Sequence, residues 1–268
     1  RKENNKEILL LSFKKNFLNK KKCNEAYHAL KKYATRKHNN RGSAAGILDK
    51  KNLPNYVKKV TKESKFRTYY VGKDNQERKD HISNYVQSGI IGYFDRYDRN
   101  QLGKDKVKPT IPCRTTKFTK EQVEKWEKCL PLIKEINEHF KTHVNGRYKI
   151  QVARAKLTKN FQILNTAFST ITINFNYRTA LHKDKGDLEE GFGNLIVLEG
   201  DKCDDKKNQY RGGYIGFPQY RVCVDVRHGD FLAMDVHQFH CNTEMIGENY
   251  SRLSLVCYLR KNMIKCLH

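Results

Sequence analysis

The sequence lacks any apolar run that could cross a bilayer, which takes about 20 residues; its longest, ILLLSF at 8–13, is much shorter. Its eight cysteines include no CxxC pair and no regular spacing. This pattern does not match zinc modules or the disulfide frameworks of small secreted proteins. We therefore expect reduced thiols, no membrane partner and an intracellular compartment, nuclear or cytoplasmic. No internal repeat or low-complexity tract is evident.

Acidic residues are scarce relative to basic ones. The chain has 29 Asp and Glu against 53 Lys and Arg, a formal net charge of +24. A strongly cationic surface attracts phosphate, which makes nucleic acid the first partner to consider. Most of the excess is Lys accompanied by many Asn, a bias that the nucleotide composition of a genome can impose without selection for binding. The charge alone therefore does not decide the partner.

The length of 268 residues suits one large domain or two small ones, and β-sandwiches or barrels often reach this size as one unit. We expect one domain over 1–268 with a basic, helical N-terminal extension at 1–45. The first residue is Arg rather than Met, as in a piece excised from a longer protein.

Helical patterns dominate the first half of the chain. Residues 1–40 are predicted to form two basic helices, and RGSAAG at 41–46 a connecting turn, with phosphate contact as the alternative. Thr119 and Gln122 have the spacing of a capping box, and apolar residues recur at helical intervals up to Phe140. This segment predicts a helix that packs on a sheet and is kinked at Pro131.

After residue 147 the apolar period changes from helical to two. Seven segments, from YKIQVAR to RLSLVCYLR, alternate or run apolar with Gly, Asn or Asp between them. This spacing predicts an α+β fold in which a double-stranded β-helix, or jelly-roll, core at 147–262 is backed by helices.

Two polar groups in this β-rich half have the composition of a metal site. His182 and Asp184 lie two positions apart in an apparent strand, so both side chains project from one face. A later strand ends at His237 and His240. Either histidine would complete a 2-His-1-carboxylate set, which leaves three positions open on non-haem Fe(II).

Arg252 follows in a further predicted strand. If its side chain points inward, the planar guanidinium can hold a carboxylate through two parallel hydrogen bonds, as a dicarboxylic co-substrate such as 2-oxoglutarate requires. Ser254 shares that face and adds a hydroxyl donor. Separately each feature has an ordinary structural explanation, but their order on successive β segments favours an oxygenase site.

The motifs HKD, HCNT and RLSLVCY, in this order, resemble the TET/JBP branch of the Fe(II)- and 2-oxoglutarate-dependent dioxygenases, over about 168–263. That family oxidises the 5-methyl group of pyrimidines in DNA. The resemblance implies Fe(II) bound by His182, Asp184 and His240, and 2-oxoglutarate held by Arg252 and Ser254. It also implies that Tyr258 stacks on an extruded base, and that His237 supports the site or is merely structural.

Two positions depart from the methylcytosine-oxidising members of the family. Asp187 lies where they have an Asn that touches the base, and Arg260 lies where they have a His. An ionised Asp only accepts hydrogen bonds, so the choice between 5-methylcytosine and thymine stays open. Lys183, Lys185 and the region of Arg114 are candidates for phosphate contacts.

We therefore expect a DNA pyrimidine dioxygenase that flips its target base into the site. Two alternatives remain. One is a 2-oxoglutarate-dependent hydroxylase of a protein or RNA, with the same metal site. The other is a non-catalytic, nucleic-acid-binding jelly-roll domain.

Overall fold

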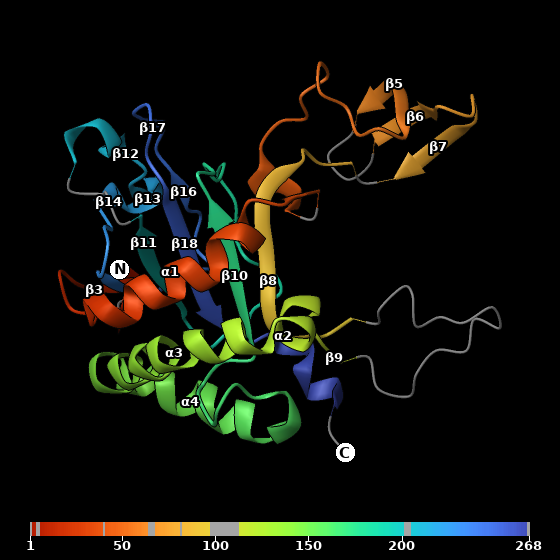
Figure 1. Cartoon of the computed structure of the whole chain (residues 1–268). Coiled ribbons are helices and arrows are strands. Elements are labelled where there is room, and N and C mark those ends of the chain that lie inside the picture. Colours follow the sequence, from red (N-terminus) through yellow and green to blue (C-terminus); the bar gives the residue numbers. More distant parts are fainter. Residues whose placement is uncertain are drawn as a thin grey trace.

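An antiparallel sheet of eight strands forms the centre of the computed structural model, which describes residues 2–3, 6–39, 41–63, 68–80, 82–96, 113–200 and 205–266 (Figure 1). The strand order is β3-β15-β11-β18-β10-β8-β4, and β9 also pairs with β8. The strands are β3 (Leu11–Lys14), β4 (Lys37–His38), β8 (Val86–Phe94), β9 (Arg114–Thr115), β10 (Thr170–Phe175), β11 (Gly193–Glu199), β15 (Phe231–Met234) and β18 (Arg252–Tyr258).

Smaller sheets complete the β structure. One has the order β14-β13-β16, another pairs β12 with β17, a third has the order β5-β6-β7, and β1 pairs with β2. Their bounds are β1 (Lys2–Glu3), β2 (Lys6–Glu7), β5 (Val57–Glu63), β6 (Thr68–Gly72), β7 (Glu77–Asp80), β12 (Arg211–Gly212), β13 (Ile215–Phe217), β14 (Val222–Val224), β16 (Cys241–Asn242) and β17 (Met245–Ile246). Leu195 and Leu232 of the large sheet share one buried apolar cluster with Ile215 and Phe217 of β13. The large sheet and the β14-β13-β16 sheet thus form the two layers of a jelly-roll.

Helices cover the opposite face of the large sheet. They are α1 (Lys20–Ala34), α2 (Lys117–Glu121), α3 (Val123–His143) and α4 (Asn145–Lys156). Short 3-10 turns lie at η1 (Gly42–Ala45), η3 (Lys159–Phe161), η4 (Lys206–Asn208), η5 (Pro218–Tyr220) and η6 (Lys261–Cys266). Figure 1 shows α1 and α3 crossing the sheet one beside the other. Leu30 of α1 and Ile133 of α3 belong to the main core, together with residues of the sheet. The predicted α+β fold with a jelly-roll core backed by helices is confirmed.

Alternation along β18 separates the core from the cavity. Leu253, Leu255 and Cys257 are fully buried in the helix-covered core. Because successive strand residues point to opposite faces, Arg252 and Ser254 face the second layer of the jelly-roll. Beside β18, Asn174 of β10 pairs in register with Ser254.

The predicted boundaries need correction at both ends of the helical half. The N-terminal extension contains one long helix, α1, and not two, because residues 11–14 form strand β3 and pair with β15 at the sheet edge. The segment YKIQVAR at 148–154 lies in helix α4 and not in a strand. Its apolar residues Tyr148 and Val152 are also spaced for one helix face, and that face packs against the main core.

The predicted capping box is also wrong. Thr119 lies inside α2, where its hydroxyl accepts a hydrogen bond from the backbone N–H of Gly92 at 2.8 Å. A separate helix, α3, begins at Val123 and runs through Pro131.

The cysteines of the described residues differ in environment, and Cys223 and Cys241 are free thiols that are not fully buried. Cys23, Cys129 and Cys257 are buried thiols, as expected, whereas Cys113 and Cys266 are joined by a disulfide across 153 residues of sequence. The expectation of reduced thiols therefore fails for this pair. Among the described helices, none combines the length and the apolar character that a membrane crossing requires.

Replacing a core residue of β18 tests the assignment of its two faces. Leu255 has no exposed surface, so Leu255→Ala should lower the free energy of unfolding by about 2–5 kcal/mol. Ile150→Ala is the control, because Ile150 is 43% exposed on α4, and should change it by less than about 1 kcal/mol. Urea unfolding followed by circular dichroism measures both, and equal losses would contradict the assignment.

Candidate active site

A cavity of about 450 Å³ lies between the two layers of the jelly-roll. Its walls include β10 and β18 of the large sheet, β13 and β16 of the small one, and the η1 segment. All eight site residues predicted from the sequence line it: His182, Asp184, Asp187, His240, Arg252, Ser254, Tyr258 and Arg260. The structure thus brings these eight residues together from three separate parts of the chain.

Backbone pairing positions the two histidines. The N–H of each, His182 and His240, donates to the carbonyl of the other at 3.0 Å, and their rings lie with centroids 4.3 Å apart. The N–H of Asp184 donates to the carbonyl of Val236 at 3.0 Å, which extends the same pairing. Nε2 of His182 lies 3.6 Å, and Nε2 of His240 3.8 Å, from the carboxylate oxygens of Asp184. One potential ligand atom from each of the three residues lies within 4.8 Å of the others.

The same local structure fixes which ring nitrogen is available. Nδ1 of His182 lies 2.8 Å from the carbonyl of Ala180, and Nδ1 of His240 lies 2.9 Å from that of Gln238. A carbonyl only accepts, so each Nδ1 carries the proton and each Nε2 lone pair points at the shared space. Burial lowers the pKa of His240, which favours the neutral imidazole that a metal ligand requires.

The donor set suits an open iron site. Two neutral imidazoles and one carboxylate are the ligands of the non-haem Fe(II) oxygenases. Among the described residues, the group contains these three side chains and no fourth His, Cys, Asp or Glu. A three-residue set leaves positions for co-substrates, whereas a fourth protein ligand is typical of structural zinc.

The structure separates His240 from the alternative, His237. Nε2 of His237 lies 3.0 Å from the carbonyl of Leu188, and its backbone N–H donates to the side chain of Asp235 at 3.1 Å. His237 is therefore engaged beside the site and does not join the group of three.

Arg252 presents hydrogen-bond donors that lack partners. Its side chain is buried, and its one contact among the described residues is from Nη2 to the carbonyl of Gly213 at 3.4 Å. Nε of Arg252 is buried without a partner in the described part of the chain. A buried guanidinium with unsatisfied donors is costly unless a ligand pairs with it. A carboxylate fits this need, and the buried Ser254 offers a hydroxyl on the same face of β18.

Arg260 is held on the cavity wall by an ion pair. Its Nε lies 2.6 Å from Oδ1 of the buried Asp95, and its guanidinium stacks 4.5 Å above the ring of Phe94. A Cβ at position 186 would lie 2.8 Å from both Nη atoms, so Gly186 makes room for the guanidinium. The orientation of Arg260 is thereby fixed before any ligand binds.

Asp187 and Tyr258 line the same wall. Burial, with the nearby charges of Asp184 and Asp95, raises the pKa of Asp187 well above its ordinary value. This shift favours the protonated form of Asp187 over the ionised form considered from the sequence, and a protonated carboxyl can donate as well as accept. Burial raises the pKa of Tyr258 to about 12, and its neutral hydroxyl lies 3.2 Å from that of Thr172.

Sequence reasoning missed Arg41 as a site residue. Arg41 precedes η1 and donates to the hydroxyl of Thr172 and to the carbonyl of Gly89, both at 3.2 Å, while its buried Nε has no partner among the described residues. The segment 41–46 was predicted as a connecting turn. No local signal identifies Arg41, because Thr172 is 131 positions away.

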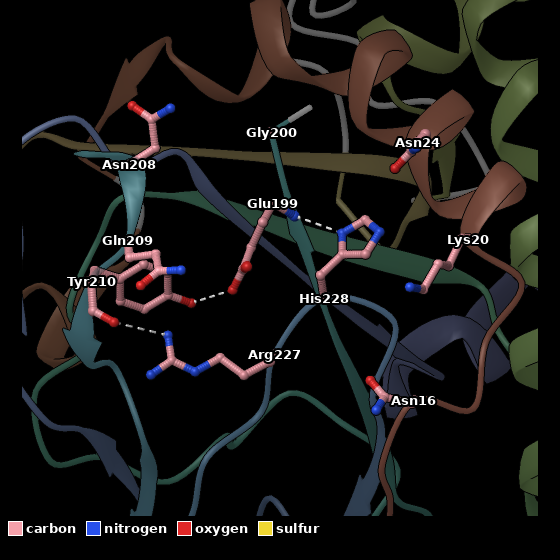
Figure 2. A pocket seen from close by; sticks show the side chains of 10 residues that line it. All are labelled: Asn16, Lys20, Asn24, Glu199, Gly200, Asn208, Gln209, Tyr210, Arg227 and His228. Carbon is pink, nitrogen blue, oxygen red and sulfur yellow. Dashed lines mark hydrogen bonds between the residues drawn. The ribbon is translucent and has the colours of Figure 1, made fainter. Parts of the chain in front are cut away.

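A second cavity of about 460 Å³ lies at the far end of β11 (Figure 2). Figure 2 shows that its main polar groups pair with one another. The hydroxyl of Tyr210 donates to Glu199 at 2.7 Å, Arg227 donates to the carbonyl of Tyr210 at 3.3 Å, and the N–H of Glu199 donates to Nδ1 of His228 at 3.0 Å. The first cavity is the better active-site candidate, because it gathers metal-ligating atoms and donors without partners.

The chain is similar to known proteins. The family model Tet_JBP, the oxygenase domain of the 2OGFeDO superfamily, matches residues 102–261. Thymine dioxygenase JBP1 of Trypanosoma brucei brucei is 30% identical over 242 residues, which are 88% of this chain and 26% of that protein. The bifunctional helicase and thymine dioxygenase JBP2 of Trypanosoma cruzi is 30% identical over 184 residues, 66% of this chain and 15% of that protein.

The chain thus spans about a quarter or less of the length of these curated relatives. Among solved structures, NgTET1 in complex with 5mC DNA matches with a TM-score of 0.48 and 16% identity, over 66% of this chain and 61% of that one.

Removing one member of the histidine pair should weaken the binding of Fe(II) strongly. In anaerobic titrations with Fe(II), the His182→Ala variant should bind at least about 100-fold more weakly, because even the loss of a partner that merely supports a ligand costs 10–100-fold. The control is His237→Gln, which lies outside the group of three and should bind like the wild type. Equal losses in both variants would mean that the metal is held elsewhere.

Arg252→Met separates ligand binding from stability. Removing one partner of a buried ion pair usually costs about 3–5 kcal/mol, but no carboxylate pairs with Arg252 in the described part of the chain. We expect the free energy of unfolding to fall by less than this range, while the Kd for 2-oxoglutarate rises at least tenfold. Calorimetric titration and urea unfolding measure the two quantities. Unchanged 2-oxoglutarate binding would remove Arg252 from the site.

Proposed function

Because the chain belongs to the Tet_JBP family, the oxygenase domain of the 2OGFeDO superfamily, we propose that it oxidises the 5-methyl group of a pyrimidine base in DNA. The observation that carries this proposal is the convergence of His182, Asp184 and His240 in one cavity. Arg252 supports it, because its donors without partners line that same cavity.

The cofactor roles follow from the chemistry of the side chains. His182, Asp184 and His240 would hold Fe(II), and Arg252 with Ser254 would hold the distal carboxylate of 2-oxoglutarate. When Fe(II), 2-oxoglutarate and O2 are bound together, they would supply the oxidation that converts a methyl C–H into C–OH, while 2-oxoglutarate is decarboxylated to succinate. The protein contributes orientation and the exclusion of water.

A methyl group inside a duplex cannot reach an enclosed site, so the nucleotide must be extruded, which costs a few kcal/mol. The cavity volume of about 450 Å³ suits one such nucleotide together with the co-substrate. Tyr258 offers an aromatic ring on the cavity wall, and stacking would offset part of the cost of extrusion.

Among pyrimidines, we propose thymine as the base. The relatives JBP1 and JBP2 are thymine dioxygenases. Arg260, fixed by Asp95, is a donor only, so it can serve a carbonyl such as O4 of thymine but cannot accept from the amino group of cytosine. A carboxyl oxygen of Asp187 beside it can accept a hydrogen bond from the N3–H of thymine. 5-Methylcytosine is the second candidate.

A DNA substrate places the protein inside the cell, in the nucleus or wherever else its DNA lies. Lys183 and Lys185 line the cavity and are placed for phosphate contacts, so the affinity for DNA should fall steeply with salt.

Nucleoside analysis tests the proposal. The protein is incubated with Fe(II), 2-oxoglutarate and ascorbate, together with unmodified DNA, 5-methylcytosine DNA or RNA, and the digested products are separated by mass spectrometry. We expect 5-hydroxymethyldeoxyuridine from unmodified DNA, succinate in equal amount, and neither product with His182→Ala.

Other outcomes assign other functions. If 5-hydroxymethylcytosine is the only oxidised nucleoside, the substrate base is 5-methylcytosine and not thymine. Substrate-stimulated succinate with RNA or a protein extract but not with DNA would favour the hydroxylase of RNA or protein. DNA binding that is unchanged in His182→Ala, with no succinate from the wild type, would leave a non-catalytic binding domain.

A further inference from the structure

The three-stranded sheet β5-β6-β7, here called the arm, projects from the body of the domain beside the end of β8 (Figure 1). It has a small apolar core of its own, formed by Val57, Tyr70 and Ile82. The arm is inserted between η1, which lines the active-site cavity, and β8, which pairs with β10. It therefore has structural support independent of the jelly-roll core.

The face of the arm opposite this core carries a row of three side chains. Tyr69 of β6 pairs in register with Lys62 of β5 on one side and with Lys79 of β7 on the other. The two Nζ atoms lie 5.9 and 5.0 Å from the centroid of the Tyr69 ring. Both lysines are exposed, and Tyr69 is half-buried. An aromatic ring between two exposed ammonium groups can contact both the phosphates and the sugars or bases of a nucleic acid.

Two ion pairs lie in and beside the arm. Arg78 forms an ion pair with Asp74, and Lys50 lies 3.6 Å from Glu63. Lys62 and Lys79 have no ion pair of this kind among the described residues, and each contacts the ring of Tyr69. The row Lys62-Tyr69-Lys79 therefore presents its positive charge to solvent.

Hydrogen bonds tie the base of the arm to the active site. The side-chain amide of Asn84 donates to the carbonyls of Ala45 and Ile47, at 2.8 and 2.7 Å. The carbonyl of Ala44 accepts from the N–H of Ala180 at 3.0 Å, and the carbonyl of Ala180 accepts from Nδ1 of His182. These hydrogen bonds connect Asn84, which lies between the arm and β8, through η1 and Ala180 to His182 of the candidate site.

We propose that the arm is a second DNA-contacting surface, in which Lys62 and Lys79 bind backbone phosphates of the duplex beside the extruded nucleotide and Tyr69 packs between them. This inference rests on the proposed function. In the proposed function the cavity takes a single nucleotide, so the flanking duplex must lie outside the cavity, where a projecting arm can contact it. The seven residues of β5 extend about 23 Å, the rise of about seven base pairs.

Salt-dependent binding tests the arm. Fluorescence anisotropy of a labelled duplex is measured between 50 and 200 mM salt with the whole chain and the Lys62→Gln/Lys79→Gln double variant. The slope of log K against log salt is negative, and each lost phosphate contact reduces its magnitude by about 0.9. We therefore expect the double variant to have a slope shallower by about 2. Tyr69→Ala should weaken binding severalfold without this change of slope, and Tyr69→Phe should bind like the wild type.

Lys128→Gln/Lys149→Gln is the matched control, because it removes the same charge from the exposed surfaces of α3 and α4, on the helical side of the sheet. It should keep the wild-type slope. Thermal unfolding of every variant shows whether the fold is retained. Equal slopes in the arm variant and the wild type, or equal changes in the arm and control variants, would overturn the proposal.

This experiment is independent of catalysis, because binding is measured without 2-oxoglutarate. If DNA is oxidised but the arm variant keeps the wild-type slope, only the role of the arm fails. If the arm variant loses duplex affinity but no DNA product forms, the proposed function fails and the DNA-binding arm stands. Weakened binding to RNA or to an acidic protein, with duplex binding unchanged, would assign the surface to another partner.

Discussion

The reciprocal backbone pair between His182 and His240 is the contact on which the active site depends. These residues lie 58 positions apart in sequence, and two N–H···O bonds set the distance between their rings. Carbonyls of the same segments, those of Ala180 and Gln238, fix the protonated nitrogen of each ring. Main-chain geometry therefore determines both the position and the chemical form of the two imidazoles, and Asp184 needs only to follow along the same segment.

Other residues of the cavity wall bury polar groups in a way that lowers the stability of the fold. Arg252 and Arg41 both have a buried Nε without a partner in the described part of the chain, and burial raises the pKa of the carboxyl of Asp187. Burial without a partner is unfavourable for each group, and a bound carboxylate or base would satisfy it. The fold tolerates them because β18 and β10 are fully packed on their other face, where Leu253, Leu255 and Ile173 join the main core.

Residues that are close in sequence to a recognisable motif could be predicted, and those that depend on tertiary contacts could not. The period of two correctly predicted that Arg252 and Ser254 share a face of a strand. The strand predicted around His182 and Asp184 is wrong, because these residues lie in an irregular segment that an isolated bridge joins to His240. The resemblance singled out His240 over His237. Arg41 lines the cavity and Asp95 pairs with Arg260 of its wall, both from distant segments, and no local pattern marks them. Helix α4 was mistaken for a strand because its apolar spacing fits both periods, and only packing against the core decides between them.

Strand β18 alternates between core residues and cavity residues at every position from Arg252 to Tyr258, and this alternation restricts how the protein can evolve. A single inserted or deleted residue would turn Arg252 toward the helices and a leucine toward the cavity, because side-chain direction has a period of two. No compensating substitution elsewhere could restore both faces at once. Length variation in this lineage should therefore be confined to the connections between strands, and the seven-residue span of β18 should be inherited intact.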